Sequence, residues 1–393
     1  MNKREGLRRS SLLAGSTLTV MAGAIIAAAL PEISMVYSHL PDAELLSKLI
    51  LTLPALFIAL LSPVAGYIVD ASGRRKVLLF ALVLYALSGT TGAYMTNIYL
   101  ILAGRALLGV AVGALMTAIV TLIGDYYEDR QRSSFMGYQA AFASTGGLLF
   151  ISAGGILTDI HWRLPFLIYA LSMIIFVMAW FSVNEPVIEK SPRKHNGSPG
   201  SFLRLVPGYV YVVYAIAFFS FAVFYMIPVQ MPFILNSLEG VSSTRIGIAI
   251  AFMNITAMLT AFNYSAIKKH LAFPVIMALV YLLVAAGYAL ISISRTYEMM
   301  VAGILVCGLG FGMQMANINL WLVQIAPARI RGRLVGYLTA FIFLGMFLSP
   351  ILLQPLIRVS SLQGSFLLVA MLLVLLAVTM FYTYKRGLWN QEF

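Results

Sequence analysis

The sequence predicts an all-α membrane protein in which twelve transmembrane helices form two six-helix bundles related by a pseudo-twofold axis. Three observations predict this fold: an apolar composition, twelve apolar runs of spanning length and an internal repeat. Of the 393 residues, 61% are hydrophobic and only 10% are charged. A water-soluble domain of this length cannot cover so much apolar surface with polar groups, whereas lipid needs no such covering. The composition therefore argues against a water-soluble enzyme.

Twelve apolar runs have about the 20-residue length that a helix needs to cross the hydrocarbon core of a bilayer. They are Leu12–Leu30, Leu46–Val69, Val77–Tyr94, Tyr99–Ile123, Phe135–Leu157, Phe166–Val183, Val210–Val229, Ile246–Ile267, Ala272–Ile293, Met299–Ile325, Leu334–Leu353 and Phe366–Tyr384. Gly and Pro inside them are tolerated, because neighbouring helices can satisfy the backbone groups that they free. Each run is therefore predicted to be a membrane-spanning helix.

A sizeable polar segment lies at residues 185–205, close to the midpoint of the chain. It combines Pro, Gly, Ser and Asn with Lys and Arg, a composition typical of a flexible linker. We therefore expect an N-terminal six-helix half at 1–184, a linker at 185–205 and a C-terminal six-helix half at 206–393.

The basic residues predict the orientation in the membrane. If the N-terminus is cytoplasmic, 20 of the 26 Lys and Arg residues fall on the cytoplasmic side, five fall on the other side, and Arg105 lies within a helix. Membrane proteins concentrate Lys and Arg in their cytoplasmic loops. We therefore predict a multi-pass protein of the plasma membrane with both termini and the linker in the cytoplasm. The net charge of +12 then reflects topology and does not indicate nucleic-acid binding.

An internal repeat supports the division into halves. A shift of 199 residues, without a gap, superposes the fourth and fifth runs on the tenth and eleventh. The matches are Gly104, Gly109 and Gly113 with Gly303, Gly308 and Gly312, Arg130 and Arg132 with Arg329 and Arg331, and Gly137-Tyr138 with Gly336-Tyr337. Composition alone produces some glycine matches, but not loop arginines and a Gly-Tyr pair in one register. The repeat therefore predicts a true duplication.

The loop after the second run carries the most specific motif, Gly66-Tyr-Ile-Val-Asp70-Ala-Ser-Gly73-Arg74-Arg75-Lys76. In a twelve-helix chain it resembles the signature loop of the major facilitator superfamily, G-x-x-x-D-x-x-G-R followed by two basic residues. The resemblance covers essentially the whole chain and implies a transporter that works by alternating access. It also implies that this loop latches the two halves together when the cytoplasmic side is closed.

The properties of the individual residues are consistent with a latch formed by Gly66, Asp70, Gly73, Arg74, Arg75 and Lys76. Gly66 would let a neighbouring helix approach closely. Asp70 would meet a helix N-terminus or Arg74, and Gly73 allows a tight turn. The alternative is a basic loop that only fixes the topology. In the second half, Lys268-Lys269-His270 keeps the charge without the Asp and Gly pattern.

The fourth run resembles a second motif of the same family, in which Arg105 is followed by Gly109 and Gly113. At 1.5 Å per residue, Arg105 lies about 12 Å inside its helix, where a charge is costly and usually functional. In related proton-coupled exporters, this arginine takes part in proton or substrate coupling. The alternative is a structural arginine bonded to carbonyl groups of a neighbouring helix.

The fifth run only partly resembles the exporter motif G-x-x-x-G-P-x-x-G-G. Gly146 and Gly154-Gly155 match, but Phe150 and Ile151 stand where Gly-Pro is expected. The segment that follows, from Asp159 to Phe166, is again similar to exporters. The resemblance therefore favours export by antiport without securing it.

The acidic residues bear on coupling and substrate charge. None of the fourteen lies in the middle of a predicted span, which counts against a strictly cationic substrate. Glu32, at the outer end of the first run, is the nearest candidate proton carrier, because partial desolvation would raise its pKa. The alternative for Glu32 is an exposed interface residue. Asp125 is expected in a cytoplasmic charged cluster with Arg130 and Arg132.

If the family pattern holds, runs one, four, seven and ten line a substrate cavity. The candidate lining residues are Tyr214, Phe218, Tyr225, Gln230, Asn254, Gln314, Asn317 and Trp321. Gln314, Asn317 and Trp321 share one helix face at i, i+3 and i+7. Amides, aromatics and one arginine suit a neutral, zwitterionic or anionic amphipathic ligand. Alternatively, the amides join helices and the aromatics lie at interfaces.

These observations predict proton-coupled export of a small organic or amphipathic molecule by alternating access. The alternatives are an importer or facilitator of a small solute, lipid translocation, and a non-transporting membrane sensor or scaffold. We expect no enzyme activity, because the sequence shows no nucleophile-base pair, phosphate loop or metal-ligand set, and Cys307 is the single cysteine. We therefore expect no cofactor and no metal, and as partners a small-molecule substrate, protons and the lipid bilayer. The protein is expected to be a monomer.

Overall fold

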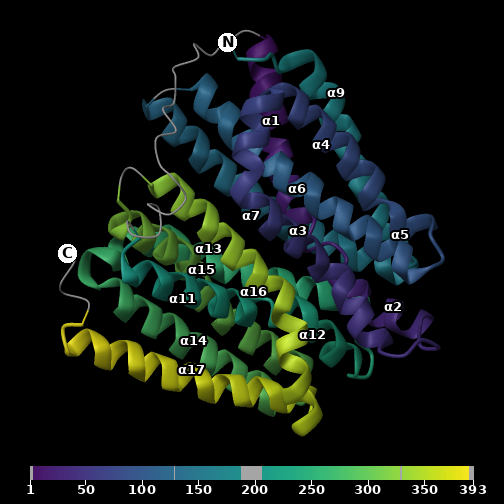
Figure 1. The fold of residues 1–393 in the computed structure, drawn as a ribbon. Helices are drawn as coiled ribbons and strands as arrows, with labels where there is room; N and C mark the ends of the chain where they lie inside the picture. Colours follow the sequence, from purple (N-terminus) through teal and green to yellow (C-terminus); the bar gives the residue numbers. More distant parts are fainter. Residues whose placement is uncertain (1–2, 128, 187–205, 328–329, 389–393) are drawn as a thin grey trace.

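The computed structural model describes residues 3–127, 129–186, 206–327 and 330–388, and the regular structure within these ranges is helical (Figure 1). The first half contains α1 (Lys3–Met21), η1 (Ala27–Ala29), α2 (Leu30–Val36), α3 (Ala43–Ser72), α4 (Arg74–Gly89), α5 (Thr91–Tyr94), α6 (Ile98–Tyr126), α7 (Asp129–Ile160), α8 (Leu164–Leu167), η2 (Ile168–Leu171) and α9 (Ser172–Ser182). The second half contains α11 (Gly208–Phe224), α12 (Met226–Asn236), α13 (Ser243–His270), α14 (Phe273–Ile293), α15 (Tyr297–Ile325), α16 (Arg331–Val359) and α17 (Leu362–Lys385). Most of the expected linker, residues 187–205, lies outside the described residues, so the division at 184 and 206 stays a prediction.

Each of the twelve predicted spans coincides with one helix or with a short series of helices. Within the described ranges, ten helical segments are long and apolar enough to cross a membrane. The first predicted span, Leu12–Leu30, falls on α1, η1 and the first residue of α2, and the fifth, Phe135–Leu157, lies within the 32-residue α7. The predicted all-α membrane fold is confirmed. The expectation of continuous α-helices is wrong for four spans. The first is interrupted at residues 22–26, the third at Thr90 and the seventh at Tyr225, and the sixth contains the 3-10 turn Ile168–Leu171.

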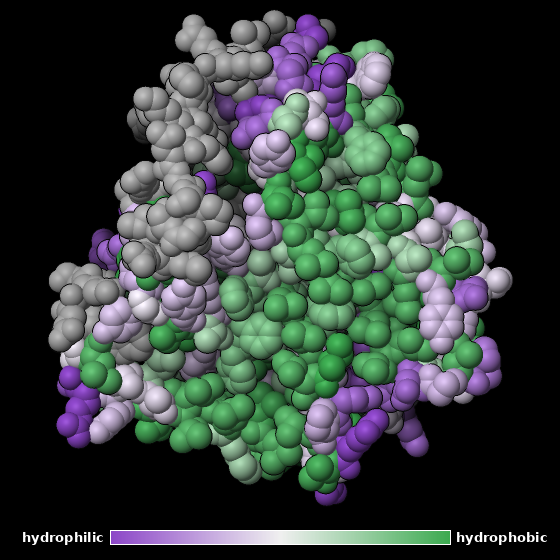
Figure 2. Space-filling view, in the orientation of Figure 1, coloured by the Kyte–Doolittle hydropathy of each residue, from purple (hydrophilic) through white to green (hydrophobic). Residues whose placement is uncertain are grey.

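The surface is that of a protein embedded in lipid. Figure 2 shows apolar side chains over broad areas of both halves, with hydrophilic side chains gathered near the ends of the helices. Phe80, Ile174 and Leu375 are each at least 60% exposed. A contiguous apolar surface of this kind is rare on soluble monomers, whereas helices that face lipid turn such side chains outward.

The 199-residue repeat is also present in three dimensions. A Cβ atom added at Gly109 of α6 would lie 2.4 Å from the carbonyl oxygen of Pro54, and one added at Gly308 of α15 would lie 2.4 Å from that of Met253. Both members of the second pair follow the first pair by 199 residues. The same backbone contact therefore holds α6 against α3 in one half and α15 against α13 in the other, as small residues allow.

The two ends of the bundle differ. We call the end with Arg74 and Arg331 the basic end, and the end with Asp159 and Ser243 the opposite end. Across the halves, α3 packs against α16 and α7 packs against α13. Figure 1 shows the helices of the two halves approaching each other near α2 and α12 and diverging toward the two chain ends.

Burial along the crossing helices agrees with this divergence. In α13, Ile246 and Ile250 are buried near the opposite end, whereas Leu259 and Phe262 are 54% and 72% exposed nearer the basic end. In α3, most residues after Leu60 are exposed, and on more than one face. The halves are therefore closed on each other at the opposite end and more open at the basic end.

The repeated glycine contact gives a test of the fold. Gly308→Ala should lower the free energy of unfolding by about 1–3 kcal/mol, because the added methyl group would overlap the backbone of α13. Thermal unfolding of the purified protein in detergent measures this change. Gly124→Ala is the matched control, since a Cβ atom there would meet no atom within 4 Å. Equal melting temperatures for the two variants would contradict the packing described.

Candidate functional site

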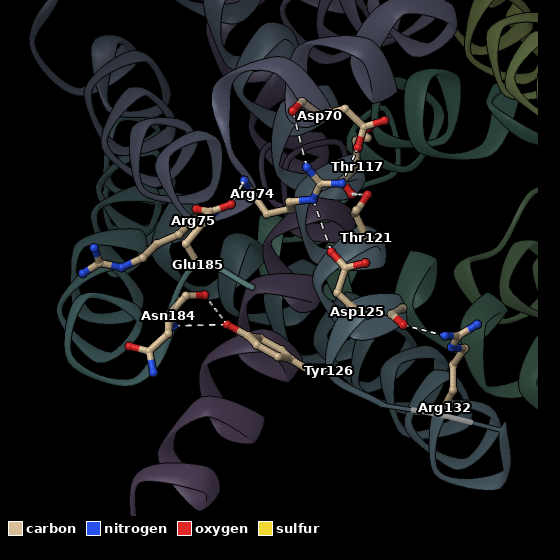
Figure 3. Close-up of polar contacts among 11 residues, drawn as sticks. Asp70, Arg74, Arg75, Thr117, Thr121, Asp125, Tyr126, Arg132, Asn184 and Glu185 are labelled. Carbon is tan, nitrogen blue, oxygen red and sulfur yellow. Dashed lines mark hydrogen bonds and ion pairs between the residues drawn. The ribbon is translucent and has the colours of Figure 1, made fainter. Parts of the chain in front are cut away.

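Charged residues from α3, α4, α6 and the segment after α9 meet at the basic end (Figure 3). Arg74, the first residue of α4, forms ion pairs with Asp70 at the end of α3 and with Asp125 at the end of α6, where Arg74 Nε lies 3.2 Å from Asp125 Oδ2. Between α3 and α4, Gly73 has φ +93°, a conformation that glycine adopts without strain. We call Asp70, Arg74, Asp125 and Glu185 the charged cluster.

Glu185 caps the N-terminus of α4. Its two carboxylate oxygens accept hydrogen bonds from the backbone N–H groups of Arg74 at 2.7 Å and Arg75 at 2.9 Å. A carboxylate at this position satisfies free N–H groups and interacts favourably with the helix dipole. Arg75 also donates to the carbonyl oxygen of Trp180 in α9, 2.9 Å away. The loop is thereby fixed to the last helix of the N-terminal half.

The predicted latch residues do not all behave as expected. Gly66 is exposed, and a Cβ atom there would meet no atom within 4 Å. The expectation of a close helix approach at Gly66 is therefore wrong for this conformation, in which the basic end is open. Lys76 is exposed as well. A latch between the halves, formed by Gly66, Asp70, Gly73, Arg74, Arg75 and Lys76, remains a proposal.

Asp125 lies in a charged cluster at the basic end, but its partner is Arg74. The predicted neighbour Arg132 instead donates to the carbonyl oxygens of Gly124 at 2.5 Å and Tyr127 at 3.0 Å. The side chain of Arg130 lies outside the described part of the structure.

Arg105 is completely buried in α6. Its Nη2 donates to the carbonyl oxygen of Gly89, 2.8 Å away, and its guanidinium lies 4.8 and 4.7 Å from the ring centroids of Phe166 and Tyr169. Among the described residues, Nε and Nη1 have no hydrogen-bond partner. Desolvated cation–π contacts contribute about 2 kcal/mol each and offset part of the cost of burying the charge. The carbonyl contact agrees with a structural role, and a coupling role for Arg105 stays a proposal.

Three tyrosine hydroxyl groups bind the backbone where the first span is interrupted. The pairs are Tyr85 with the carbonyl of Leu18 at 2.7 Å, Tyr169 with that of Ala22 at 3.1 Å, and Tyr225 with that of Gly23 at 3.4 Å. The Leu18 carbonyl also accepts a hydrogen bond from the backbone N–H of Ala22. In lipid, carbonyl groups freed by a helix break, here those of Ala22 and Gly23, need partners within the protein. Tyr225 belongs to the C-terminal half, so this bond also joins the halves.

Two carboxylates of the N-terminal half meet the start of α13 at the opposite end. Asp159, near the end of α7, accepts hydrogen bonds from the backbone N–H groups of Ser243 at 2.6 Å and Thr244 at 3.0 Å. Glu32 of α2 accepts a hydrogen bond from the hydroxyl group of Ser243 at 3.1 Å. We call Glu32, Asp159, Ser243 and Thr244 the junction. A Cβ atom at Gly155 would lie 2.5 Å from the carbonyl oxygen of Ser243, so glycine lets the helices meet here.

Glu32 and Asp159 each lie two residues beyond the end of a predicted span, since the first span ends at Leu30 and the fifth ends at Leu157. Burial raises the pKa of Glu32; the hydrogen bond from Ser243 lowers it, and the charge of Asp159 raises it further. Burial also raises the pKa of Asp159, but hydrogen bonds from Thr244 and Ser243 outweigh it and leave that pKa below its usual value. The junction thus holds Asp159 ionised, whereas Glu32 binds a proton more readily than in water.

The predicted cavity face of α15 makes contacts inside the C-terminal half. Asn317 accepts a hydrogen bond from Tyr264 and donates one to the carbonyl oxygen of Phe273, both at 3.1 Å. Trp321 stacks on the ring of Phe273, with centroids 5.7 Å apart. Gln314 is buried as well. Asn317 and Trp321 therefore join α15 to α13 and α14 in this conformation.

The aromatic candidates on α11 also pack within the protein. Tyr214 donates to the carbonyl oxygen of Leu334 at 2.9 Å and stacks on Phe341, with ring centroids 5.0 Å apart. Phe218 is half-buried. Tyr214 therefore fixes α11 against α16.

Two predicted cavity residues keep unused polar atoms. Gln230 is fully buried, and neither its Oε1 nor its Nε2 has a partner among the described residues; the same holds for Nδ2 of Asn254. A buried amide without partners is costly unless a ligand or water satisfies it. Gln230 and Asn254 are therefore the candidates that the contacts favour for binding a polar group.

In the described ranges, no group of three or more His, Cys, Asp or Glu side chains is placed to hold a metal ion. Cys307 is a buried free thiol in α15.

Comparison with known proteins decides the family. The family model of the Major Facilitator Superfamily matches residues 12–350, and a second match covers residues 213–392. The chain belongs to the major facilitator superfamily. Membership of this family agrees with the expectation of a transporter and not an enzyme.

Relatives of this major facilitator protein match part of the chain. It is 29% identical to multidrug resistance protein 2 of Bacillus subtilis (strain 168) over 160 residues, 40% of either protein. It is 26% identical to quinolone resistance protein NorA of Staphylococcus aureus (strain Mu50) over 128 residues, 32% of this chain and 33% of NorA. The aligned region spans less than half of these relatives.

Solved structures share the fold over nearly the whole chain. A bacterial homologue of the human lysosomal transporter Spinster, in an inward-facing and unoccupied conformation, matches with a TM-score of 0.79 and covers 100% of this chain and 99% of that one. A D-xylose-proton symporter matches with a TM-score of 0.76 and covers 96% and 97%. Both are 16% identical to this chain, so they show the fold alone.

The junction is the part of the site that the sequence did not predict as a unit. Two signals were present. Ser242-Ser243-Thr244 before an apolar run is typical of a helix N-terminus, and Asp159 stands two residues after the end of the fifth run. A single sequence does not show that these two ends meet. The capping role of Glu185 is missing from the prediction for the same reason.

The stacked guanidinium gives a second test. Arg105→Lys should reduce the transport rate about tenfold, which corresponds to about 1.4 kcal/mol in the activation free energy of transport, because an ammonium group cannot stack on two rings as a guanidinium does. Initial rates in vesicles with matched protein amounts measure this loss. Arg295→Lys, at an exposed position, serves as the control. Unchanged transport by Arg105→Lys would show that the stacked geometry is not needed.

Proposed function

We propose that this major facilitator protein exports a small organic or amphipathic molecule from the cytoplasm by proton-coupled antiport. The two halves would alternate access across the plasma membrane, with both termini and the basic end in the cytoplasm. The observation that carries the proposal is the one-sided closure. The junction joins the halves at the opposite end, while α3 and α13 are exposed toward the basic end. A carrier in this state is ready to take up substrate from the cytoplasm.

Two comparisons support the state and the direction. The structure of the Spinster homologue, with a TM-score of 0.79, is described as inward-facing. The partial relatives are named for multidrug and quinolone resistance, a property that export of the compound would confer.

Proton coupling is proposed at Glu32 and Arg105. Glu32 lies where the halves meet, so a change in its charge acts directly on the contact between them. Arg105 touches Tyr169, which binds the interrupted first span. Both residues are thus connected to parts of the protein that must rearrange during alternating access.

The substrate class follows from the polar groups inside the bundle. None of the fourteen acidic residues lies in the middle of a predicted span, so a cation would find no counter-charge there. Among the described residues, Gln230 has an unpaired amide donor and acceptor, and Asn254 has an unpaired amide donor. We therefore propose a neutral, zwitterionic or anionic amphipathic substrate, bound by a monomer.

Import is the second candidate. Phe150 and Ile151 replace the Gly-Pro element that the exporter motif leads us to expect, and in this structure the carbonyl of Ile151 lies against Gly247 of α13. A D-xylose-proton symporter shares the fold. Import and export are distinguished by the direction in which a proton gradient drives the solute.

Everted vesicles provide the test. A fluorescent quinolone, which is zwitterionic near neutral pH, should accumulate inside everted vesicles whose lumen is acidified, and collapsing the gradient should stop the accumulation. Glu32→Gln should remove the dependence on the gradient, because its side chain cannot be ionised. Glu239→Gln, an exposed carboxylate at the same end, is the control and should behave like the wild type.

The same vesicles check the orientation and the alternative. In a Cys307→Ala background, Ser72→Cys at the basic end should react with an impermeant thiol reagent in everted vesicles and not in intact cells. Accumulation in right-side-out vesicles driven by external acid would indicate symport and would overturn the proposed direction.

A further inference from the structure

We infer that Asp159 holds the opposite end of the transporter closed by capping the N-terminus of α13, and that a proton on Glu32 strengthens this closure. The role of Asp159 concerns the conformational cycle and does not depend on the coupling ion. The role of Glu32 rests on the proposed proton coupling. Asp159 acts here as a positioning residue, since it sets the conformation and does not touch substrate.

Three successive backbone N–H groups at the start of α13 have side-chain acceptors. The first N–H groups of a helix have no partner within the helix. Asp159 accepts those of Ser243 and Thr244, and the N-cap Ser242 accepts that of Arg245 with its side chain. A carboxylate in this position also interacts favourably with the positive end of the helix dipole. The unusual feature is that the carboxylate comes from the other half of the protein.

The backbones of α7 and α13 are in direct contact beside the cap, so the cap can form only when the two halves are closed at this end. A Cβ atom at Gly155 of α7 would lie 2.5 Å from the carbonyl oxygen of Ser243, and one at Gly247 of α13 would lie 2.8 Å from that of Ile151. Any separation of α7 from α13 at this end therefore moves Asp159 away from the N–H groups that it binds. Opening the opposite end must break the cap.

Glu32 adds a titratable group to the same contact. The charges that face it are Asp159 and, just beyond α7, His161. On the helices packed against α2, Glu44 and Lys48 of α3 pair with each other, and α12 has no titratable side chain. On α13, the nearby Arg245 pairs with Glu298. Of the two neighbours, the Asp159 carboxylate acts more strongly on Glu32 and raises its pKa, whereas His161 lowers it.

The direction of the pH effect follows from these neighbours. The pKa of Glu32 is raised in the closed form, so a proton on Glu32 favours closure, and this contribution is lost as the pH rises through the raised pKa. The pKa of Asp159 is lowered, so its cap is present above the usual aspartate pKa and is lost only as the pH falls through the lowered value. Mild acidification from neutral pH should therefore tighten the closed end.

A cysteine reporter tests the cap without substrate or gradient. In a Cys307→Ala background, Ala251→Cys places a thiol one turn below Gly247, where the closed form leaves 2% of the residue exposed. Asp159→Asn should raise the rate at which an impermeant maleimide labels this thiol by about 2- to 30-fold, the range that loss of a helix cap gives. Glu239→Gln is the control and should leave the rate unchanged. Glu32→Gln should keep labelling slow and independent of pH.

A second pair of variants tests the other side of the cap. Ser243→Pro removes the N–H group that donates to Asp159 at the helix position where proline is tolerated, and the extended backbone of Ser242 accepts a following proline. It should speed labelling as Asp159→Asn does. Ser243→Ala keeps that N–H group and should label near the wild-type rate.

The outcomes separate this inference from the proposed function. Unchanged labelling in both Asp159→Asn and Ser243→Pro would overturn it, whatever the protein transports. A parallel rise at Ala285→Cys, buried within α14, would indicate general loosening and would also count against it. Failure of the vesicle experiment with quinolone, by contrast, would leave the labelling result intact.

Discussion

Close contact between helix backbones at glycine residues is the interaction on which the rest of this structure depends. Within each half it recurs at positions 199 residues apart, where Gly109 and Gly308 lie against the neighbouring helix. Between the halves it recurs at Gly155 and Gly247. Because there is no hydrophobic driving force for helices to associate within lipid, packing of this kind must hold them together. It also brings a carboxylate of α7 within reach of the start of α13.

The second constraint is that polar groups inside the membrane must find partners within the protein. The interrupted first span depends on three tyrosine hydroxyl groups, one of them, Tyr225, from the other half. Arg105 is held by a carbonyl group and two aromatic rings. Gln230 departs from this rule among the described residues, and its unused amide is where we place a polar group of the substrate. Buried polar groups that bind each other stabilise the fold, whereas the buried amide of Gln230, which has no partner among the described residues, is a candidate for binding substrate.

The sequence predicted the features that depend on composition and on periodicity along the chain. Span number, the repeat and the charged loop follow from the apolar runs and from residues 66–76, and the turn at Gly73 is as predicted. Features that depend on which helices meet were not predictable from one sequence. The break near Gly23 is stabilised by tyrosines from distant helices, Asn317 and Trp321 have partners on α13 and α14, and Asp159 binds a helix that begins 84 residues later. Local patterns identify such residues as polar or aromatic but do not give their partners.

The central claim is that the two ends of the bundle open in alternation around the contacts described. Distances between spin labels in lipid nanodiscs test it most directly, with one pair at Thr96 and Glu239 on the opposite end and another at Ser72 and Lys269 on the basic end. As substrate and pH are varied, the account predicts that one distance lengthens while the other shortens. Two distances that stay fixed, or that lengthen together, would contradict it.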